Sequence, residues 1–208
     1  MTFTRLGPPD PRLDHLVYAT PDLDAAVTAF AAVSGVEPVE GGRHLGRGTR
    51  NHLVGLGPTS FLEIIGPDHD YPAEPGAVVP FGIAELTGPR LVTWAVAPSD
   101  IEAAVAASGI GPIEPMARRT PAGDLLEWRL TPSGAAPPGV PFLIDWGSTP
   151  HPAAALPRVG LTGLGATLPD PDAVEGVLAA LDVTLALEPG PRALVALLDT
   201  PRGPVTLT

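Results

Sequence analysis

Residues 13–27 read LDHLVYATPDLDAAV, a short apolar run that ends at a Thr-Pro pair and continues into a segment rich in Asp and Ala. The run is typical of a strand, and Asp22 and Gly35 are suited to begin and end a helix after it. Past Gly35 the hydrophobic period falls towards two, which predicts three further strands and hence a β-α-β-β-β unit. These strands are expected at residues 36–41, 49–56 and 60–65, with turns at Gly41-Gly42 and Gly57-Pro58.

The same pattern returns 78 residues later, where residues 91–105 read LVTWAVAPSDIEAAV. FLEIIG at 61–66 likewise has a counterpart, FLIDWG, at 142–147. The other elements predicted here are strands at 113–119 and 125–130, and a linker at 68–89 with one helical turn near 81–86. Two copies of one unit in the same order indicate an internal repeat.

A shorter third copy is predicted at the C-terminus. Its elements are a strand at 161–168, a helix within 169–182, and strands at 183–187, 193–198 and 205–208. We therefore interpret the chain as an α+β protein with units at 12–67, 90–151 and 158–208, the third packed on the same domain as the first two.

Composition excludes several classes of function. The 208 residues carry a net charge of −11, which disfavours a nucleic-acid partner. The chain has no Cys, and all 12 of its basic residues are Arg, which excludes thiolate nucleophiles, Schiff-base lysines and Walker-A loops. We expect no nucleotide, flavin or pyridoxal phosphate, no membrane partner, and a cytoplasmic location, because no signal-like or spanning apolar segment is found.

The duplicated unit, with LDHLVYATPDLDAAV, GRGTRNH at 46–52 and FLEIIGPD at 61–68, resembles the glyoxalase-like branch of the vicinal oxygen chelate superfamily. The resemblance is closest over residues 12–67 and extends to 151. It implies that two units pair into a curled mixed sheet, a cup with helices on its outside. Members of the superfamily include glyoxalases, dioxygenases, epimerases and metal-free bleomycin-binding proteins, so the fold leaves the function open.

Strand alternation predicts which side chains point into the cup. Leu62 and Ile64 form the natural face towards the helix of the first unit, which turns Glu63 inwards. In the second unit, Leu126, Trp128 and Leu130 are assigned to the helix side by the same reasoning. The predicted polar lining is His15, Asn51, Glu63, Thr93, Glu127 and Arg129.

In metal-dependent members the ligands come from the first and fourth strands of each unit, which the resemblance places at His15 and Glu63. An imidazole and a carboxylate suit a divalent Fe, Mn, Zn, Ni or Co ion. The second unit departs from the pattern, with Thr93 and Ile144 at the corresponding positions. Candidates for a third donor are Glu127, His44, His52 and Asp145.

Non-catalytic roles compete with these assignments. His15 is equally compatible with a hydrogen-bonded core residue, and Glu63 with a buried salt bridge to Arg129. The cationic loop carrying Arg43, Arg47 and Arg50 suits either a lid that binds an anionic group or a solvated turn, and Arg118-Arg119 occupies a similar place in the second unit.

Two function hypotheses follow. In the first, a lyase, isomerase or oxygenase binds a small, oxygen-bearing, anionic metabolite, and a divalent metal at His15 and Glu63 acts as Lewis acid. Glu63 or Glu127 then moves a proton, while the ligand contacts Arg50, Asn51, Thr93 and Arg129. In the second, a metal-free protein sequesters a small molecule without catalysis. Either is compatible with a homodimer formed through residues 157–208.

Overall fold

The computed structural model describes residues 6–132 and 139–208. In the first unit, Asp22 caps the helix by accepting a hydrogen bond from the Ala25 amide, and Gly35 ends it in the left-handed conformation, as predicted. The elements of this unit are β1 (Leu13–Ala19), α1 (Leu23–Ser34), β2 (Val39–His44), β3 (Thr49–Gly55) and β4 (Phe61–Pro67).

The second unit repeats this order, and Asp100 and Gly109 cap its helix in the same way. Its elements are β5 (Arg90–Val96), α2 (Ile101–Ser108), β6 (Glu114–Arg119), β7 (Leu125–Leu130) and β8 (Phe142–Asp145). A short 3-10 helix, η1 (Pro80–Glu85), lies in the linker, and a second one, η2 (Pro152–Ala155), follows β8. Residues 133–138, which precede β8 in the chain, lie outside the described residues.

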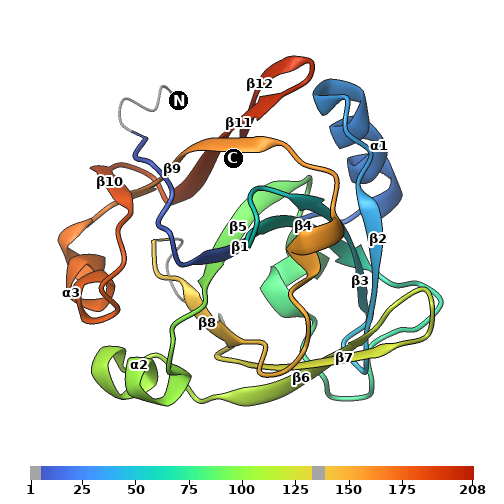
Figure 1. Ribbon diagram of the computed structural model, residues 1–208, viewed down its shortest axis with the longest axis horizontal. Helices are drawn as coiled ribbons and strands as arrows, with labels where there is room; N and C mark the ends of the chain where they lie inside the picture. The colour runs from blue at the N-terminus through green and yellow to red at the C-terminus, as the bar shows by residue number, and fades with distance from the viewer. Residues whose placement is uncertain (1–5, 133–138) are drawn as a thin grey trace.

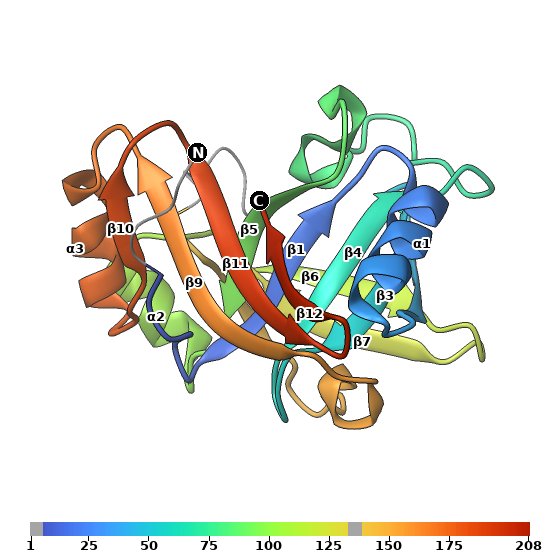
Figure 2. The same ribbon diagram turned by 90° about the horizontal axis from the view of Figure 1, so that it is seen from above.

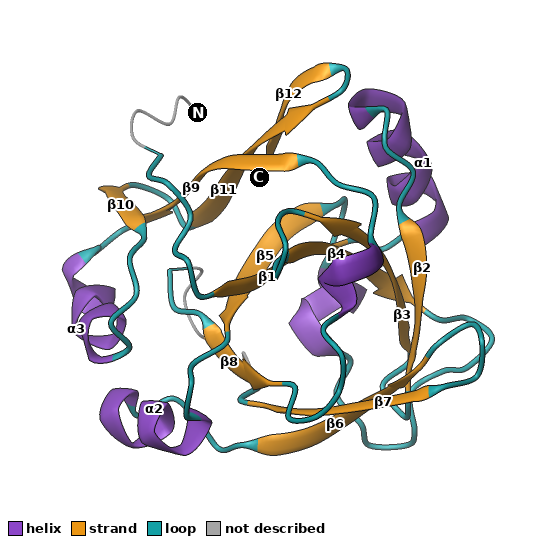
Figure 3. Ribbon diagram, in the orientation of Figure 1, coloured by secondary structure: helices purple, strands orange, loops and turns teal. Residues whose placement is uncertain are grey.

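The two units together form one eight-stranded sheet that closes on itself in the order β1-β4-β3-β2-β6-β7-β8-β5 (Figures 1 and 3). The units join where β1 runs antiparallel to β5, and again where Arg43 and His44 of β2 pair with Arg119 and Arg118 of β6. The predicted curled mixed sheet with outer helices is confirmed. Its closure within one chain produces a barrel instead of an open cup.

The turn predicted at Gly41-Gly42 is wrong, because both glycines lie inside β2. Gly42 has a φ of 132°, and a Cβ atom there would lie 2.0 Å from the Arg119 carbonyl oxygen. Glycine therefore allows β2 to approach β6 closely at the seam of the barrel. The turn at Gly57-Pro58 is confirmed, with the Gly57 amide donating to the Ser60 carbonyl.

A separate four-stranded sheet follows the barrel in the chain. Its elements are β9 (Gly160–Leu168), α3 (Asp172–Ala180), β10 (Ala186–Pro189), β11 (Ala193–Thr200) and β12 (Gly203–Leu207). The strand order is β10-β9-β11-β12, so β9 pairs in parallel with the first strand after its helix. In the first unit, β1 pairs in parallel with the last strand instead. The third unit thus repeats the order of elements, while its strand pairing differs.

The barrel wall lies between an outer apolar core and an inner one. The outer core joins α1, the outer face of the barrel and the C-terminal sheet, and includes Leu16, Leu62 and Trp94. The inner core includes Ile65 and Phe142. Figure 2 shows the C-terminal sheet alongside the barrel, and η1 and η2 at opposite ends of the barrel. The barrel interior is therefore the place in which a site can form.

None of the helices in the described ranges combines the length and the apolar character needed to span a bilayer.

Candidate functional site

A cavity of about 570 Å³ lies inside the barrel and is lined by both units and by η1. Its walls are largely apolar and contain five of the eight Phe and Trp residues of the chain. These are Phe61, Phe81, Trp128, Phe142 and Trp146. Cavities of this size with apolar walls and a few polar groups are typical of small-molecule sites.

The polar groups of the cavity gather around the buried carboxylate of Glu63. Asn51 Nδ2 donates a hydrogen bond of 2.5 Å to Glu63 Oε1. His44 Nε2 lies 3.6 Å from the same oxygen, and His15 Nε2 lies 3.9 Å from Oε2. Strands β1, β2, β3 and β4 each contribute one member of this cluster, so the pleat of the first unit aims all four side chains inwards.

Ring stacking fixes the position of His15 in the cluster. Its imidazole lies parallel to the Phe61 ring, with centroids 4.7 Å apart, and edge-on to Phe142 at 5.2 Å. Its Nδ1 atom lies 2.5 Å from Asp14 Oδ1. Although burial raises the pKa of Asp14, hydrogen bonds from His15 and His151 outweigh it and lower the pKa to about 2. Asp14 is thus an ionised partner for His15.

His44 is neutral at neutral pH. Burial lowers its pKa to about 4, and the charge of Arg118 adds to this effect, while the Glu63 carboxylate opposes it. The contact between His44 and Glu63 is therefore between a neutral imidazole and a carboxylate. Thr49 Oγ1 lies 3.0 Å from His44 Nδ1 and holds the ring in place.

Arg118 brings a buried cation to the cavity, with 3% of the residue exposed. Burial lowers the pKa of this guanidinium and Glu63 raises it, but an arginine remains charged at neutral pH. Its Nη1 atom donates to the neutral Asn51 Oδ1 at 2.9 Å. A Cβ atom at Gly41 would lie 2.1 Å from Nη1 and 2.3 Å from Oδ1, so glycine is required under this contact.

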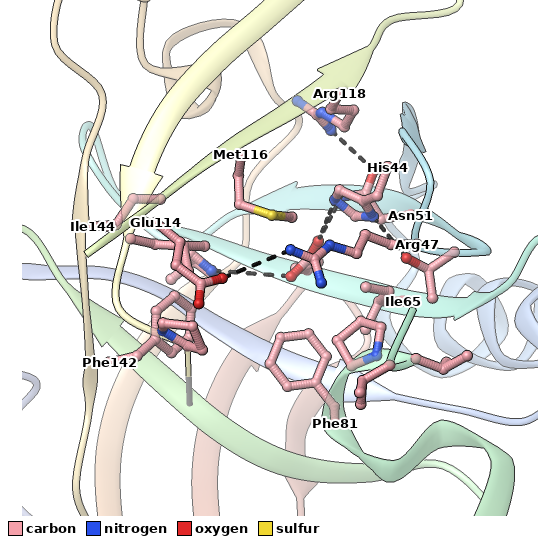
Figure 4. Close-up of a pocket in the computed structure, with 18 of the residues that line it drawn as sticks. His44, Arg47, Asn51, Ile65, Phe81, Glu114, Met116, Arg118, Phe142 and Ile144 are labelled. Carbon is pink, nitrogen blue, oxygen red and sulfur yellow. Dashed lines mark hydrogen bonds and ion pairs between the residues drawn. The ribbon is translucent and has the colours of Figure 1, made fainter. Parts of the chain in front are cut away.

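Arg47 extends from the β2–β3 turn across the cavity towards Glu114 of β6 (Figure 4). Its Nη2 atom lies 3.8 Å from Glu114 Oε2, and the two side chains are 34% and 42% exposed. One member of the cationic loop predicted from the sequence therefore reaches the cavity.

A family model described as "Glyoxalase-like domain" matches residues 13–181. The chain belongs to the glyoxalase-like domain family. The resemblance to the vicinal oxygen chelate superfamily is thereby confirmed. Among curated proteins, none matches this sequence.

One solved structure supports the fold of this glyoxalase-like domain, and two others are more distantly similar. A hypothetical protein from Staphylococcus aureus is similar over 93% of this chain and 83% of its own, with a TM-score of 0.60 and 16% identity. Methylmalonyl-CoA epimerase from Mycobacterium tuberculosis is 22% identical over 74% of this chain and 97% of its own, with a TM-score of 0.44. A mutant 4-hydroxymandelate synthase from Streptomyces coelicolor is 18% identical over 97% of this chain and 62% of its own, with a TM-score of 0.45. The last two are too distant to inform the chemistry of this domain.

The domain brings together some of the predicted site residues and separates others. His15, Asn51 and Glu63 meet in the cavity, and the candidate donor His44 joins them. Arg50 instead pairs with Asp24 of α1 at 2.6 Å, on the outside of the barrel. Thr93 is buried opposite Val17 and is not among the described residues that line the cavity.

The inward orientation predicted for Glu127 and Arg129 is wrong. Both are exposed, and Trp128 between them points into the cavity. The prediction assumed that a helix covers the outer face of β7, whereas α2 packs against α3 and β8. Without that cover the apolar face of β7 turns inwards. Arg129 pairs with Glu102 and Asp145, so the predicted salt bridge between Glu63 and Arg129 is also wrong.

The chemistry of the cluster fits a divalent metal, because two imidazoles and one carboxylate converge. Donors that share an ion at about 2.1 Å each lie roughly 3.0–3.4 Å apart, whereas His44 and His15 lie 3.6 and 3.9 Å from Glu63 oxygens. As they stand, no three His, Cys, Asp or Glu side chains within the described residues are arranged to hold a metal ion. The donor types fit, and their side chains would have to draw closer together to share one ion.

Arg118 and Asp14 are the contributors that strand alternation missed. Arg118 reaches the cavity through the β2–β6 pairing, which has no local sequence signal. Asp14 contacts His15 although neighbouring strand residues normally face opposite sides. A resemblance between the Arg-containing loops of the two units was the one available hint of Arg118.

Proposed function

We propose that the barrel cavity binds a small, oxygen-bearing metabolite and that Glu63 transfers a proton on it. The observation that carries this proposal is the convergence of His15, His44 and Asn51 on one buried carboxylate, with Arg118 bonded to Asn51, inside a largely apolar cavity. The chemistry best matched is proton transfer beside a carbonyl group, as isomerases and lyases perform it.

The two oxygens of Glu63 have different tasks in this proposal. Oε1 accepts the Asn51 amide, which orients the carboxylate. Oε2 faces His15 at 3.9 Å, which is beyond hydrogen-bond distance, so this oxygen is not bonded to the His15 ring. Oε2 is therefore the oxygen that exchanges a proton with the ligand, because a general base must reach its proton directly or through one water.

Arg118 determines which ligand oxygen is favoured. Its bonded neighbour Asn51 is neutral, and among the described residues the anion whose charge acts on it is the more distant Glu63. A carboxylate or enolate oxygen of the ligand would gain a charge-assisted hydrogen bond from this guanidinium. The ligand is accordingly anionic at the end that lies next to Asn51.

His15, His44 and Glu63 would hold a divalent ion in this site. The ion would polarise a ligand oxygen as a Lewis acid. A neutral His44 is ready to coordinate it, since its pKa of about 4 leaves the ring unprotonated at pH 7.

A second candidate function is metal-free binding without catalysis. Two observations favour it: the donors are more widely spaced than those of a formed metal site, and Oε1 of Glu63 is already occupied by the Asn51 amide. The second unit, moreover, supplies no donor at Thr93 or Ile144.

Calorimetric titration of chelator-treated, tag-free protein separates the two functions. The probes are Zn²⁺ and Mn²⁺ alone, and then the series of 2-oxo acids from pyruvate to 2-oxooctanoate with their neutral methyl esters. Glu63→Gln and His15→Ala are compared with Glu127→Gln, which alters an exposed carboxylate outside the cavity.

We expect one equivalent of metal to bind to the wild type and to Glu127→Gln, and not to Glu63→Gln. If the protein binds the 2-oxo acids without metal and prefers the acids over their esters, the result supports the second candidate function, metal-free binding. Equal binding of metal and acids by the wild type and the Glu63→Gln and His15→Ala variants would contradict both.

A further inference from the structure

Asp14 is the most deeply buried charged residue beside the cavity, with 1% of it exposed. Three nitrogen donors surround its carboxylate. Oδ1 lies 2.5 Å from His15 Nδ1, and Oδ2 lies 2.9 Å from Trp146 Nε1 and 3.1 Å from His151 Nε2. A buried carboxylate is costly unless it is hydrogen-bonded in this way.

A β-bulge makes the contact with His15 possible. Along β1, Leu13 pairs with Val96 and His15 with the adjacent Ala95, so Asp14 is the extra residue without a partner on β5. In a regular strand its side chain would point away from that of His15. Bulges re-aim side chains and are frequent next to active sites.

The partners of Asp14 fix the direction of the hydrogen bond to His15. The indole nitrogen of Trp146 can only donate, so Oδ2 is an acceptor. A carboxyl group is also a much stronger acid than a protonated imidazole, so Oδ1 accepts as well and the proton between Asp14 and His15 belongs to Nδ1. The opposite nitrogen of the ring, Nε2, is the one that lies beside Glu63.

We propose that Asp14 is a positioning residue, whose carboxylate keeps a proton on His15 Nδ1 and so presents Nε2 to the cavity. The tautomer exists with or without a ligand. Only its consequence, a ring nitrogen available for ligand or metal, rests on the proposed function. A histidine held by a carboxylate in this manner is oriented and made a better donor.

The experiment records long-range ¹H–¹⁵N correlation spectra of chelator-treated protein with labelled histidine at one fixed pH of 7.5. The five histidines are assigned with single substitutions, His15→Gln among them. In the wild type, Nδ1 of His15 is expected at the chemical shift of a protonated ring nitrogen. In Asp14→Asn, the amide group donates to Nδ1, and the proton is expected to move to Nε2.

Asp10→Asn is the matched control, because Asp10 is also buried and accepts bonds from Arg12 and Thr184, away from the cavity. It should lower stability and leave the His15 signals unchanged. An unprotonated Nδ1 in the wild type, or the same His15 tautomer in Asp14→Asn, would overturn the proposal. If Asp14→Asn does not fold, the wild-type spectrum still decides.

Zn²⁺ titration gives the functional consequence. Asp14→Asn should weaken binding roughly 10–100-fold, the usual effect of removing a carboxylate behind a metal-ligating histidine. Absence of Zn²⁺ binding by the wild type would refute the proposed metal function and leave the tautomer result standing. Unchanged Zn²⁺ affinity in Asp14→Asn would refute the positioning role.

Discussion

Lowering the pH from 7 to 5 should destabilise this protein through His44. In the folded state its pKa is about 4 because of burial, whereas an unfolded chain has an ordinary histidine pKa of 6.5. Between these values the unfolded chain binds a proton that the folded chain does not. The free energy of unfolding therefore falls as the pH drops below 6.5, and the loss is complete near pH 4.

The two pKa values give the size of the effect. Proton linkage predicts a loss of about 2 kcal/mol between pH 7 and pH 5 from this one imidazole, and about 3 kcal/mol over the whole range. A domain with a total stability of roughly 5–15 kcal/mol would register that change clearly.

The assay is urea denaturation at pH 7 and pH 5 with a chelator present, for wild type and His44→Gln. Comparing the pH-dependent change within each protein removes the general cost of the substitution. The wild type should lose about 2 kcal/mol more than His44→Gln. His69→Gln, at an exposed histidine, serves as the control and should behave as the wild type. Equal losses in the wild type and in His44→Gln would refute the reasoning.

Three further predictions concern the barrel and its cavity. Leu62→Ala empties a fully buried site in the outer core, and urea denaturation should show a loss of about 2–5 kcal/mol. Gly42→Ala should lower the free energy of unfolding by about 2 kcal/mol or more and speed amide exchange in β6, because its Cβ atom would meet the Arg119 carbonyl oxygen. Gly76→Ala is the control: Gly76 also has a positive φ, but a Cβ atom there meets open space, so its loss of stability should be smaller. Gly41→Ala displaces Arg118, so calorimetry should show binding of 2-oxo acids weakened about tenfold, and urea denaturation should show a loss of about 1–3 kcal/mol because a buried hydrogen bond is broken.

Local signals were sufficient to predict β1, α1 and β4 in the first unit. The caps Asp22 and Gly35 define α1, and the alternation along β4 places Glu63 inside the barrel because Leu62 and Ile64 pack in the outer core. Each of these features depends on residues close together in the chain.

The remaining features depend on distant parts of the chain. The orientation of β7 follows from which helix covers it, and nothing in LLEWRL reveals that α2 packs elsewhere. Arg118 reaches Asn51 only after β2 and β6 pair, and Asp14 reaches His15 only through a bulge set by the register with β5. Pairing and register were therefore the parts that sequence patterns could not supply.

The indole signals of the three tryptophans give the most direct test of ligand binding inside the barrel. Trp128 and Trp146 line the cavity, while Trp94 lies in the outer core and serves as an internal control. Titration of ¹⁵N-labelled protein with the 2-oxo acid series should shift the Trp128 and Trp146 signals and leave Trp94 in place. Binding inside the barrel would be contradicted if the Trp128 and Trp146 signals stay in place across the whole series, or if all three tryptophan signals shift equally.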